Sequence, residues 1–129
     1  MKALFTFISV FVLSFSQLAW SHTPEKTTDW QAFSKNLVKA LATPNEGLQL
    51  SAMQRIITYA DKLDVDDAVF DIMRFYRDHK NEKVRQLALT TLYKTQNKWA
   101  MGFLRLAVRF EKSPLLKRQI YKILENYDG

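Results

Sequence analysis

Very few residues in this chain combine the types and spacing that catalysis requires. Asp78 and His79 are adjacent, and a carboxylate beside an imidazole could orient it as a general base. No serine nucleophile is placed with them. The chain also has no cysteine, which excludes thiol nucleophiles and cysteine metal sites, and it has no glycine-rich phosphate loop. We therefore expect no enzymatic activity and no cofactor, and we expect His79 to be a solvated loop residue.

Four aspartates lie close together in the middle of the chain: Asp61, Asp64, Asp66 and Asp67. Clustered carboxylates are ligands that Ca²⁺ prefers, but the segment lacks the glycine turn and the distal glutamate of an EF-hand loop. At the start of a helix the same aspartates would accept hydrogen bonds from free N–H groups and complement the helix dipole. The sequence therefore favours helix capping and predicts no metal site.

A second polar pattern runs along a segment that is otherwise apolar. Its members are spaced four, three, four and three residues apart, so on one helix they form a single row: Lys98, Gly102, Arg105, Arg109 and Lys112. Four cations with a glycine gap could bind a carboxylate, a phosphate or an acidic helix. The simpler interpretation is a solvated stripe whose long side chains cover an apolar helix. The four cations are nevertheless the best candidates for contact with a partner.

The first 21 residues have the pattern of a secretory signal. Lys2 supplies a positive start, residues 4–13 are apolar, and Ala19 and Ser21 occupy the −3 and −1 positions before His22. Cleavage would leave a short polar lead, residues 22–28, and one domain, residues 29–129. The predicted location is the bacterial periplasm or, in a eukaryote, the secretory pathway. If the signal is not cleaved, the same segment would anchor the protein in a membrane.

The charged residues are segregated along the chain. Residues 83–122 contain ten basic residues and one acidic residue, Glu111, whereas acidic residues outnumber basic ones in residues 61–82. Such a dipole could attract an anionic partner, or a second copy head to tail. We expect an acidic protein surface as the partner, with an anionic membrane or envelope polymer as the alternative. Self-association stays open, and nucleic acid is disfavoured because exported proteins rarely meet it.

Apolar residues recur at helical spacing through the rest of the chain, which predicts six helices. We expect them at residues 29–42, 48–63, 65–78, 82–95, 98–112 and 114–127. Thr28 with Gln31 fits a capping box for the first helix, and Asp64, Asn81 and Ser113 are candidate caps for later ones. Because the connections are short, neighbouring helices should be antiparallel, giving three helical hairpins.

The same pattern leads to two expectations about packing. The helix at residues 98–112 is apolar on most sides, so we expect it to pack between neighbours. Phe70, Leu89 and Tyr93 lie away from the inner faces of their helices. In an isolated hairpin they would mark an interface, but in a stack they would contact the adjacent hairpin, which is the interpretation we favour.

The last two hairpins are similar to each other at an offset of 32 residues. Segment 81–92 recurs in outline at 113–124, and segment 45–56 matches 81–92 at an offset of 36 residues. The pattern Asn81-x-x-Val84-Arg85-x-x-Ala88-x-x-x-Leu92 resembles the second helix of a HEAT repeat, which usually begins with Asp or Pro and continues Val-Arg-x-x-Ala. The resemblance covers residues 65–125 well and the first hairpin loosely. The third unit has lysine and isoleucine where arginine and alanine are typical.

This resemblance implies an all-α fold of three antiparallel helical hairpins, stacked as a short right-handed α-solenoid. HEAT-repeat proteins scaffold protein contacts, so the implied function is an exported binding or scaffolding module with no catalysis of its own. Three repeats are close to the smallest number that buries a continuous core. The alternative is a small helical bundle that binds an anionic ligand, an envelope polymer or a membrane surface.

Overall fold

The computed structural model describes residues 27–127, and this part of the chain is helical with no strand. Its helices are α2 (Trp30–Ala42), α3 (Glu46–Tyr59), α4 (Val69–Asp78), α5 (Glu82–Thr95), α6 (Lys98–Ala107) and α7 (Pro114–Asn126), with short 3₁₀ helices at Ala60–Lys62 (η1) and Asp66–Ala68 (η2). The prediction of an all-α protein is confirmed for these residues. The predicted signal peptide, residues 1–21, lies outside the described residues, as do residues 22–26 of the polar lead. Within residues 27–127 no helix is both long and apolar enough to cross a membrane.

Polar side chains explain where five of the helices begin. The side chains of Asp29, Asn45 and Asn97 each accept a hydrogen bond at 3.1 Å from the backbone N–H three residues further on. Asn81 accepts from the N–H two residues further on in α5, at 2.8 Å, and Ser113 from the N–H three residues further on in α7, at 3.3 Å. Each cap satisfies a backbone donor that has no partner within the helix, and contributes about 1 kcal/mol. The predicted caps Asn81 and Ser113 are therefore confirmed.

Some predicted boundaries were wrong. Asp29, not Thr28, caps the first helix, because its backbone is extended and its carboxylate reaches the first turn. Asn45 caps α3, which therefore begins two residues earlier than predicted, and α3 ends in a 3₁₀ turn instead of continuing to residue 63. The prediction that Asp64 caps the third helix was also wrong: α4 begins only at Val69, after a 3₁₀ turn, and Asp64 instead accepts a hydrogen bond from the N–H of Asp66 at 3.4 Å before that turn.

The end of α6 differs most from prediction, because the helix stops at Ala107 instead of continuing to residue 112. The backbone N–H groups of Arg109 and Phe110 bond to carbonyls three residues back, at 3.2 and 3.0 Å, which tightens the last turn. Glu111 then turns inward, and its carboxylate accepts a hydrogen bond from the hydroxyl of Tyr76 at 2.6 Å. We attribute the early end of α6 to this buried carboxylate, which holds the chain inward.

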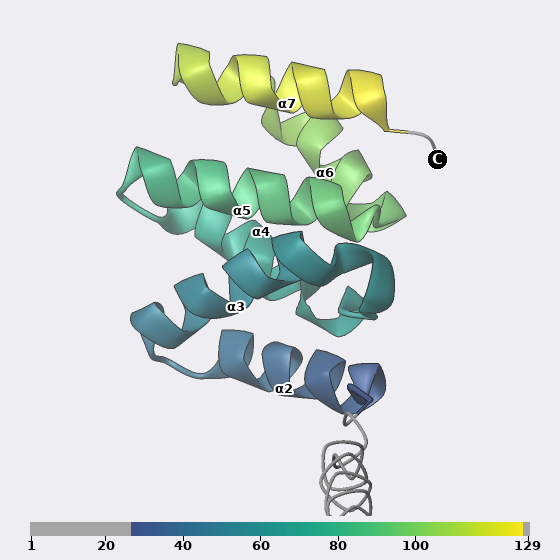
Figure 1. Cartoon of the computed structure of the whole chain (residues 1–129). Coiled ribbons are helices and arrows are strands. Elements are labelled where there is room, and N and C mark those ends of the chain that lie inside the picture. Colours follow the sequence, from purple (N-terminus) through teal and green to yellow (C-terminus); the bar gives the residue numbers. More distant parts are fainter. Residues whose placement is uncertain (1–26, 128–129) are drawn as a thin grey trace, which may run out of the picture.

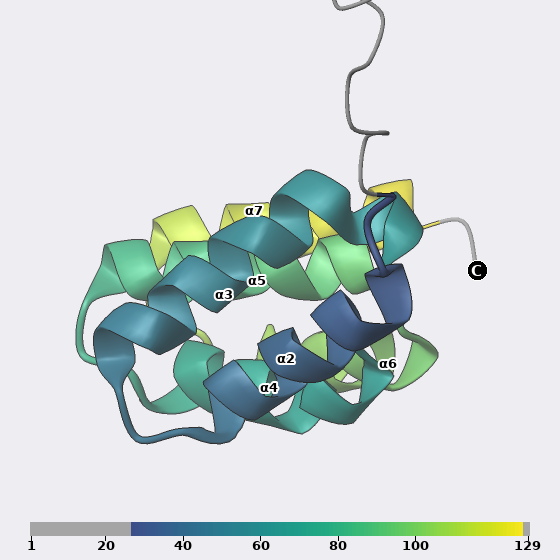
Figure 2. The same cartoon turned by 60° about the horizontal axis from the view of Figure 1, so that its bottom comes forward.

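The six helices form two layers that run up the molecule (Figure 1). Figure 2 shows α2, α4 and α6 in one layer and α3, α5 and α7 in the other. Consecutive helices pack as α2 with α3, α4 with α5, and α6 with α7, while α5 lies between α3 and α7 in its own layer. Each helix pair therefore lies beside the next pair along the chain.

One hydrophobic core runs through all six helices. Its fully buried side chains include Met53 from α3, Ile72 from α4, Leu92 from α5, Leu104 from α6 and Ile120 from α7. Burial of each such side chain contributes about 1.5–3 kcal/mol.

The expectation for the residues off the inner faces is confirmed in part. Leu89 is completely buried, and Tyr93 is half-buried against the core. The prediction for Phe70 was wrong, because 65% of this side chain is exposed. It lines a hollow together with Trp99 and Leu106 of the next helix pair, but these side chains do not bury it.

Candidate functional site

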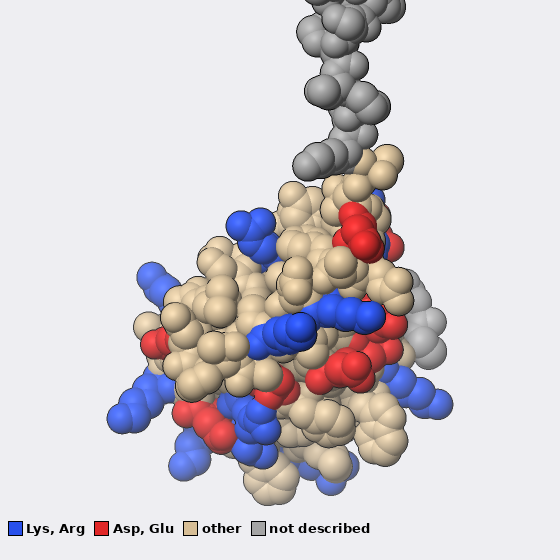
Figure 3. Space-filling model, turned by 90° about the horizontal axis from the view of Figure 1, so that it is seen from below, with Lys and Arg blue, Asp and Glu red and all other residues tan. Residues whose placement is uncertain are grey.

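The aspartate cluster serves the fold. Asp64 accepts a hydrogen bond from the N–H of Asp66 at 3.4 Å, and the cluster links two helix pairs, because Asp66 Oδ1 accepts a hydrogen bond from the Asn97 side chain at 3.0 Å. Figure 3 views the molecule from the α2 end, where blue and red side chains are interleaved. Among residues 27–127 no three His, Cys, Asp or Glu side chains lie close enough to hold a metal ion.

His79 also differs from a catalytic base. Its Nε2 pairs with Glu46 from the preceding helix pair, and its Nδ1 accepts a hydrogen bond from the N–H of Asn81 at 3.0 Å. The ring stacks on Phe75, with 6.0 Å between ring centroids. The neighbouring Asp78 bonds instead to Arg77, and this hydrogen bond lowers the pKa of Asp78. His79 is thus a partly buried link between helix pairs, where the sequence predicted a solvated loop residue.

The row of cations predicted on one helix is divided by the early end of α6. Lys98 and Arg105 lie on α6 and, with Gly102 between them, line a hollow of about 690 Å³. Lys112 lies beyond the helix and lines a second hollow of about 560 Å³. Arg109 lines neither of these two hollows. The structure therefore brings Lys98 and Arg105 to one site and places Lys112 at its extension.

The same face of α6 exposes large apolar side chains, which overturns the expectation that this helix packs between neighbours. Trp99 is 77% exposed, Leu106 61% and Phe110 81%. Phe70 from α4 lines the first hollow beside Trp99 and Leu106. Side chains of this size are usually buried, so their concentration on one face makes this face the candidate binding surface.

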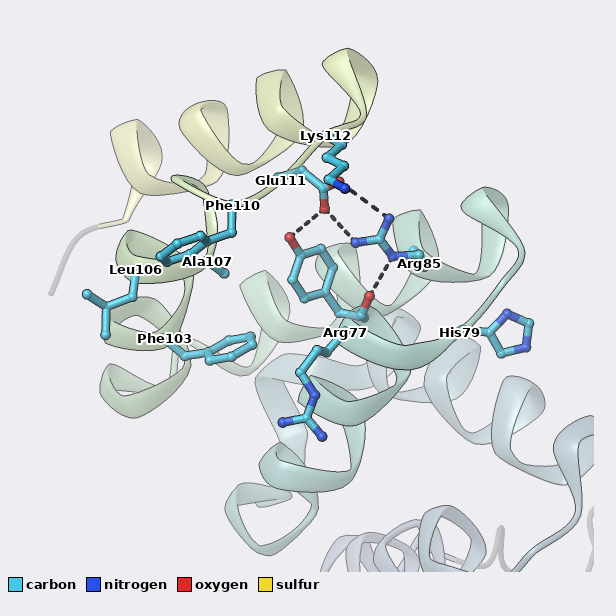
Figure 4. Close-up of a pocket in the computed structure, with 10 residues that line it drawn as sticks. Arg77, His79, Arg85, Phe103, Leu106, Ala107, Phe110, Glu111 and Lys112 are labelled. Atoms are coloured by element: carbon cyan, nitrogen blue, oxygen red, sulfur yellow. Dashed lines mark hydrogen bonds and ion pairs between the residues drawn. The ribbon is translucent and has the colours of Figure 1, made fainter.

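The two hollows form one groove between α4 and α6. Phe103 and Leu106 line both hollows and so connect them. Figure 4 shows the second hollow, where Phe103 and Leu106 of α6 are followed by Phe110 in the turn after this helix, and Lys112 lies at the far end. We call the two hollows together the aromatic groove. Its apolar side chains are Phe70, Met73, Trp99, Phe103, Leu106 and Phe110, and its polar rim includes Lys98, Arg105 and Lys112.

A buried polar network forms the floor of the second hollow. Arg85 from α5 binds Glu111 through Nη2 at 2.5 Å and also donates from Nε to the carbonyl of Tyr76 at 2.6 Å. Tyr76 donates its hydroxyl to Glu111, and the N–H of Ser113 donates to the other carboxylate oxygen at 3.0 Å. The network thus ties the α4–α5 pair to the segment that connects α6 with α7.

This network also determines the ionisation of Glu111, the acidic residue beside the second hollow. Burial alone would raise the pKa of Glu111, but the hydrogen bonds from Tyr76, Ser113 and Arg85 and the charge of Arg85 outweigh it and keep that pKa below its usual range. Burial, and then the hydrogen bond to Glu111, raise the pKa of Tyr76. Glu111 is therefore ionised and paired at neutral pH, so the only acid in residues 83–122 adds no free negative charge to the groove.

The cations on the rim lack such partners. Among the described residues, no acidic side chain forms an ion pair with Lys98, Arg105 or Lys112. Arg77, which also lines the second hollow, is paired with the exposed Asp78. The groove therefore combines large apolar side chains with a rim whose unpaired charges are positive.

Sequence reasoning found the cations but missed the aromatic side chains beside them. Trp99, Phe103, Leu106 and Phe110 are spaced four, three and four residues apart, the same spacing as the cations shifted by one position. This pattern is visible in the sequence as a second apolar stripe. It was attributed to the core because the sequence alone does not say which stripe of an apolar helix faces inward.

No family model, no curated protein and no solved structure matches the chain. The side chains of the groove and the contacts between helix pairs are therefore the observations that bear on its function.

Proposed function

We propose that this protein is an exported binding or scaffolding module with no catalysis of its own, whose partner is a protein with an acidic surface. The observation that carries the proposal is the aromatic groove, where exposed Trp and Phe side chains stand beside unpaired Lys and Arg. Tryptophan, tyrosine and arginine dominate binding energy at protein interfaces. An apolar surface with a cationic rim complements an acidic partner.

We further propose that the three helix pairs form a short right-handed α-solenoid of HEAT-like hairpins. Hydrogen bonds between successive pairs recur at similar sequence separations, which supports a repeated unit. Glu46 pairs with His79, Glu82 with Ser113, and Asp66 with Asn97, over 33, 31 and 31 positions. In a stack of repeats each unit contacts only its neighbours, so equivalent contacts recur at the length of the unit.

The non-catalytic part of the proposal is supported by the way in which the polar groups of the groove are used. Tyr76, Arg85 and Glu111 are bonded to one another and hold two helix pairs together. The raised pKa of Tyr76 and the lowered pKa of Glu111 suit a fixed hydrogen bond, and they are opposite to the shifts that would prepare a general base or a general acid for neutral pH.

A second candidate function is binding to an anionic membrane surface or envelope polymer by a small helical bundle. Trp99 and Phe110, both largely exposed, stand near cations. Aromatic side chains beside lysine and arginine also favour the interface of an anionic lipid bilayer. The two candidates differ in whether the anionic surface belongs to a protein.

Capture from solubilised cell envelope, at low and at high salt, tests the proposal. The expected result is a discrete protein partner that is bound by the wild-type protein, released by salt, and lost when Lys98→Glu and Arg105→Glu are combined. Lys94→Glu with Lys122→Glu is the matched control, because it changes the net charge equally on exposed residues that line neither hollow. Recovery of lipid or polymer alone would favour the second candidate. Equal loss of the partner in both double variants would mean that binding depends on the net charge of the protein and not on the groove.

A further inference from the structure

We propose that the aromatic groove binds an amphipathic acidic helix of the partner, with the apolar face of that helix between α4 and α6 and its carboxylates against Lys98, Arg105 and Lys112. This inference rests on the proposed function, because it names the chemistry and the secondary structure of the protein partner. Four observations support it: the shape of the groove, an open glycine on its floor, the spacing of its apolar side chains, and the sign of its charges.

The shape of the groove fits a helix. Its two hollows measure about 690 and 560 Å³ and lie end to end through Phe103 and Leu106. The wall made by α6 contains 10 residues, which at a rise of 1.5 Å per residue is about 15 Å, or nearly three turns of a partner helix. A helix that lies in an apolar groove with three or four anchoring side chains is a recurring mode of peptide recognition.

Gly102 leaves open space in the middle of this wall. It lies inside α6, where glycine is less favourable than alanine, and a Cβ atom added to it would meet nothing within 4 Å. Packing within the protein therefore does not require a glycine at this position. A partner that approaches the α6 backbone closely would require one.

The apolar side chains along α6 repeat at the spacing of a helical surface. Trp99, Phe103, Leu106 and Phe110 follow one another at four, three and four residues, and Phe70 stands across the first hollow on α4. Apolar side chains on a partner helix at the same spacing can alternate with them. Trp99 is the expected anchor, because it is large and exposed and lies beside the open space at Gly102.

The charges decide the chemistry of that helix. The unpaired charges of the rim are the cations Lys98, Arg105 and Lys112, and Glu111 is neutralised by Arg85. A basic helix would gain no partner in this groove, whereas an acidic helix would pair with cations near both ends. A flat lipid surface could reach the exposed rings but would leave the space at Gly102 unused, so the concave floor favours a peptide.

The test is selection of peptides of about four helical turns from a random displayed library, using the protein expressed from its complete sequence and purified as the cell processes it. We expect the selected peptides to have apolar residues at three- and four-residue spacing with Asp and Glu between them. Fluorescence anisotropy with the best peptide should show roughly thirtyfold weaker binding for Trp99→Ala and at least about tenfold weaker binding for Gly102→Leu. Replacing the acidic residues of the peptide with lysine should abolish binding.

The chain offers a matched control for the glycine variant. Gly47 is also helical, lies exposed in the first turn of α3, and has room for a Cβ at ordinary contact distance. Gly47→Leu should leave peptide affinity within about twofold of wild type. The unfolding midpoint of Gly102→Leu should equal or exceed that of wild type, because leucine favours helix and meets no clash. If Gly102→Leu folds poorly, the peptide affinity of Trp99→Ala alone tests the inference.

Other outcomes would overturn the inference. They are selection of no peptide, selection of basic peptides, or equal binding by wild type, Trp99→Ala and Gly102→Leu. Saturable binding to vesicles of phosphatidylglycerol and phosphatidylethanolamine without peptide selection would assign the groove to a lipid surface. Dimerisation that Trp99→Ala abolishes would assign it to a second copy. If an envelope protein is still captured by Gly102→Leu and Trp99→Ala, this inference fails while the proposed binding function stands.

Discussion

Two hollows on this molecule differ in the arrangement of their charges. The hollow at the α2 end, of about 720 Å³, is rimmed by three lysines and three aspartates: Lys35, Lys39, Lys62, Asp64, Asp66 and Asp67. Its tryptophan, Trp30, packs against Phe33 and Tyr59 and has Lys62 above its ring. In the aromatic groove the unpaired charges are all positive, and Trp99 is 77% exposed.

This difference is the reason why we propose a partner for the aromatic groove and not for the hollow at the α2 end. Where opposite charges share one rim, their fields largely cancel, and a packed tryptophan contributes to the fold. Where charges of one sign surround exposed aromatic rings, both the charge and the apolar area stay uncompensated until something binds. Volume does not distinguish these surfaces, because the hollow with mixed charges is slightly larger than either half of the groove.

Among the substitutions considered, removing the side chain of Arg85 should lower the stability of the protein most. Arg85→Ala would leave the Glu111 carboxylate buried without its cation, and we expect the free energy of unfolding to fall by about 3 kcal/mol in urea titration. The control is Arg77→Ala, which removes an exposed ion pair in the same hollow and should leave the free energy of unfolding close to that of wild type, because solvent screens such a pair. Equal effects of the two substitutions would contradict the structural role of the network.

Acid should weaken the same network more gently. The pKa of Glu111 in the folded protein is lowered from the ordinary value of 4.5, so below this pH the unfolded chain binds the proton more readily than the folded one. The contribution of Glu111 to stability is therefore present above pH 4.5 and should be lost as the pH falls through the folded pKa. Urea titration at a series of acid pH values measures this slope. Glu111→Gln should flatten it, and an unchanged slope in that variant would assign the acid sensitivity to other carboxylates.

The packed Trp30 and the exposed Trp99 offer the finest test of the comparison. Trp30→Ala removes two aromatic contacts, at 6.0 and 5.5 Å between ring centroids, and should cost about 2 kcal/mol of stability. Trp99→Ala removes a side chain that is mostly in water and should change stability by less than about 0.5 kcal/mol. Thermal or urea unfolding of both variants measures the difference. A large loss in Trp99→Ala would mean that Trp99 supports the fold.

The helices could be predicted from the sequence because their signals are local. Asn81 and Ser113 cap α5 and α7 as expected, and the main buried stripes follow helical periodicity. The end of α6 could not be predicted, because it depends on a contact between Glu111 and residues of another helix pair. Such a contact joins residues that are far apart in the sequence, and no local pattern marks it. The one signal was that Glu111 is the single acid in a long basic segment.

The groove was predicted only in part, for a related reason. The sequence located Lys98, Arg105 and Lys112, which the structure places on the rim. It assigned Trp99 and Phe110 to the core because α6 carries two apolar stripes. Only the packing of the helices decides that the stripe containing Leu104 faces inward and the other faces solvent. Amphipathicity therefore indicated a helix but did not indicate its orientation.

The short reach of the polar contacts has a consequence for how the chain folds. Among the described residues, side-chain hydrogen bonds join positions no more than 35 residues apart, the longest being between Tyr76 and Glu111. Closing each such loop has a similar and modest entropic cost, and chains with mostly local contacts fold quickly. Because synthesis begins at the N-terminus, helices α2 to α5 can therefore pack together before α7 has been made. Helices α6 and α7 then pack against the helices that have already folded, so the ion pair between Arg85 and Glu111 forms late.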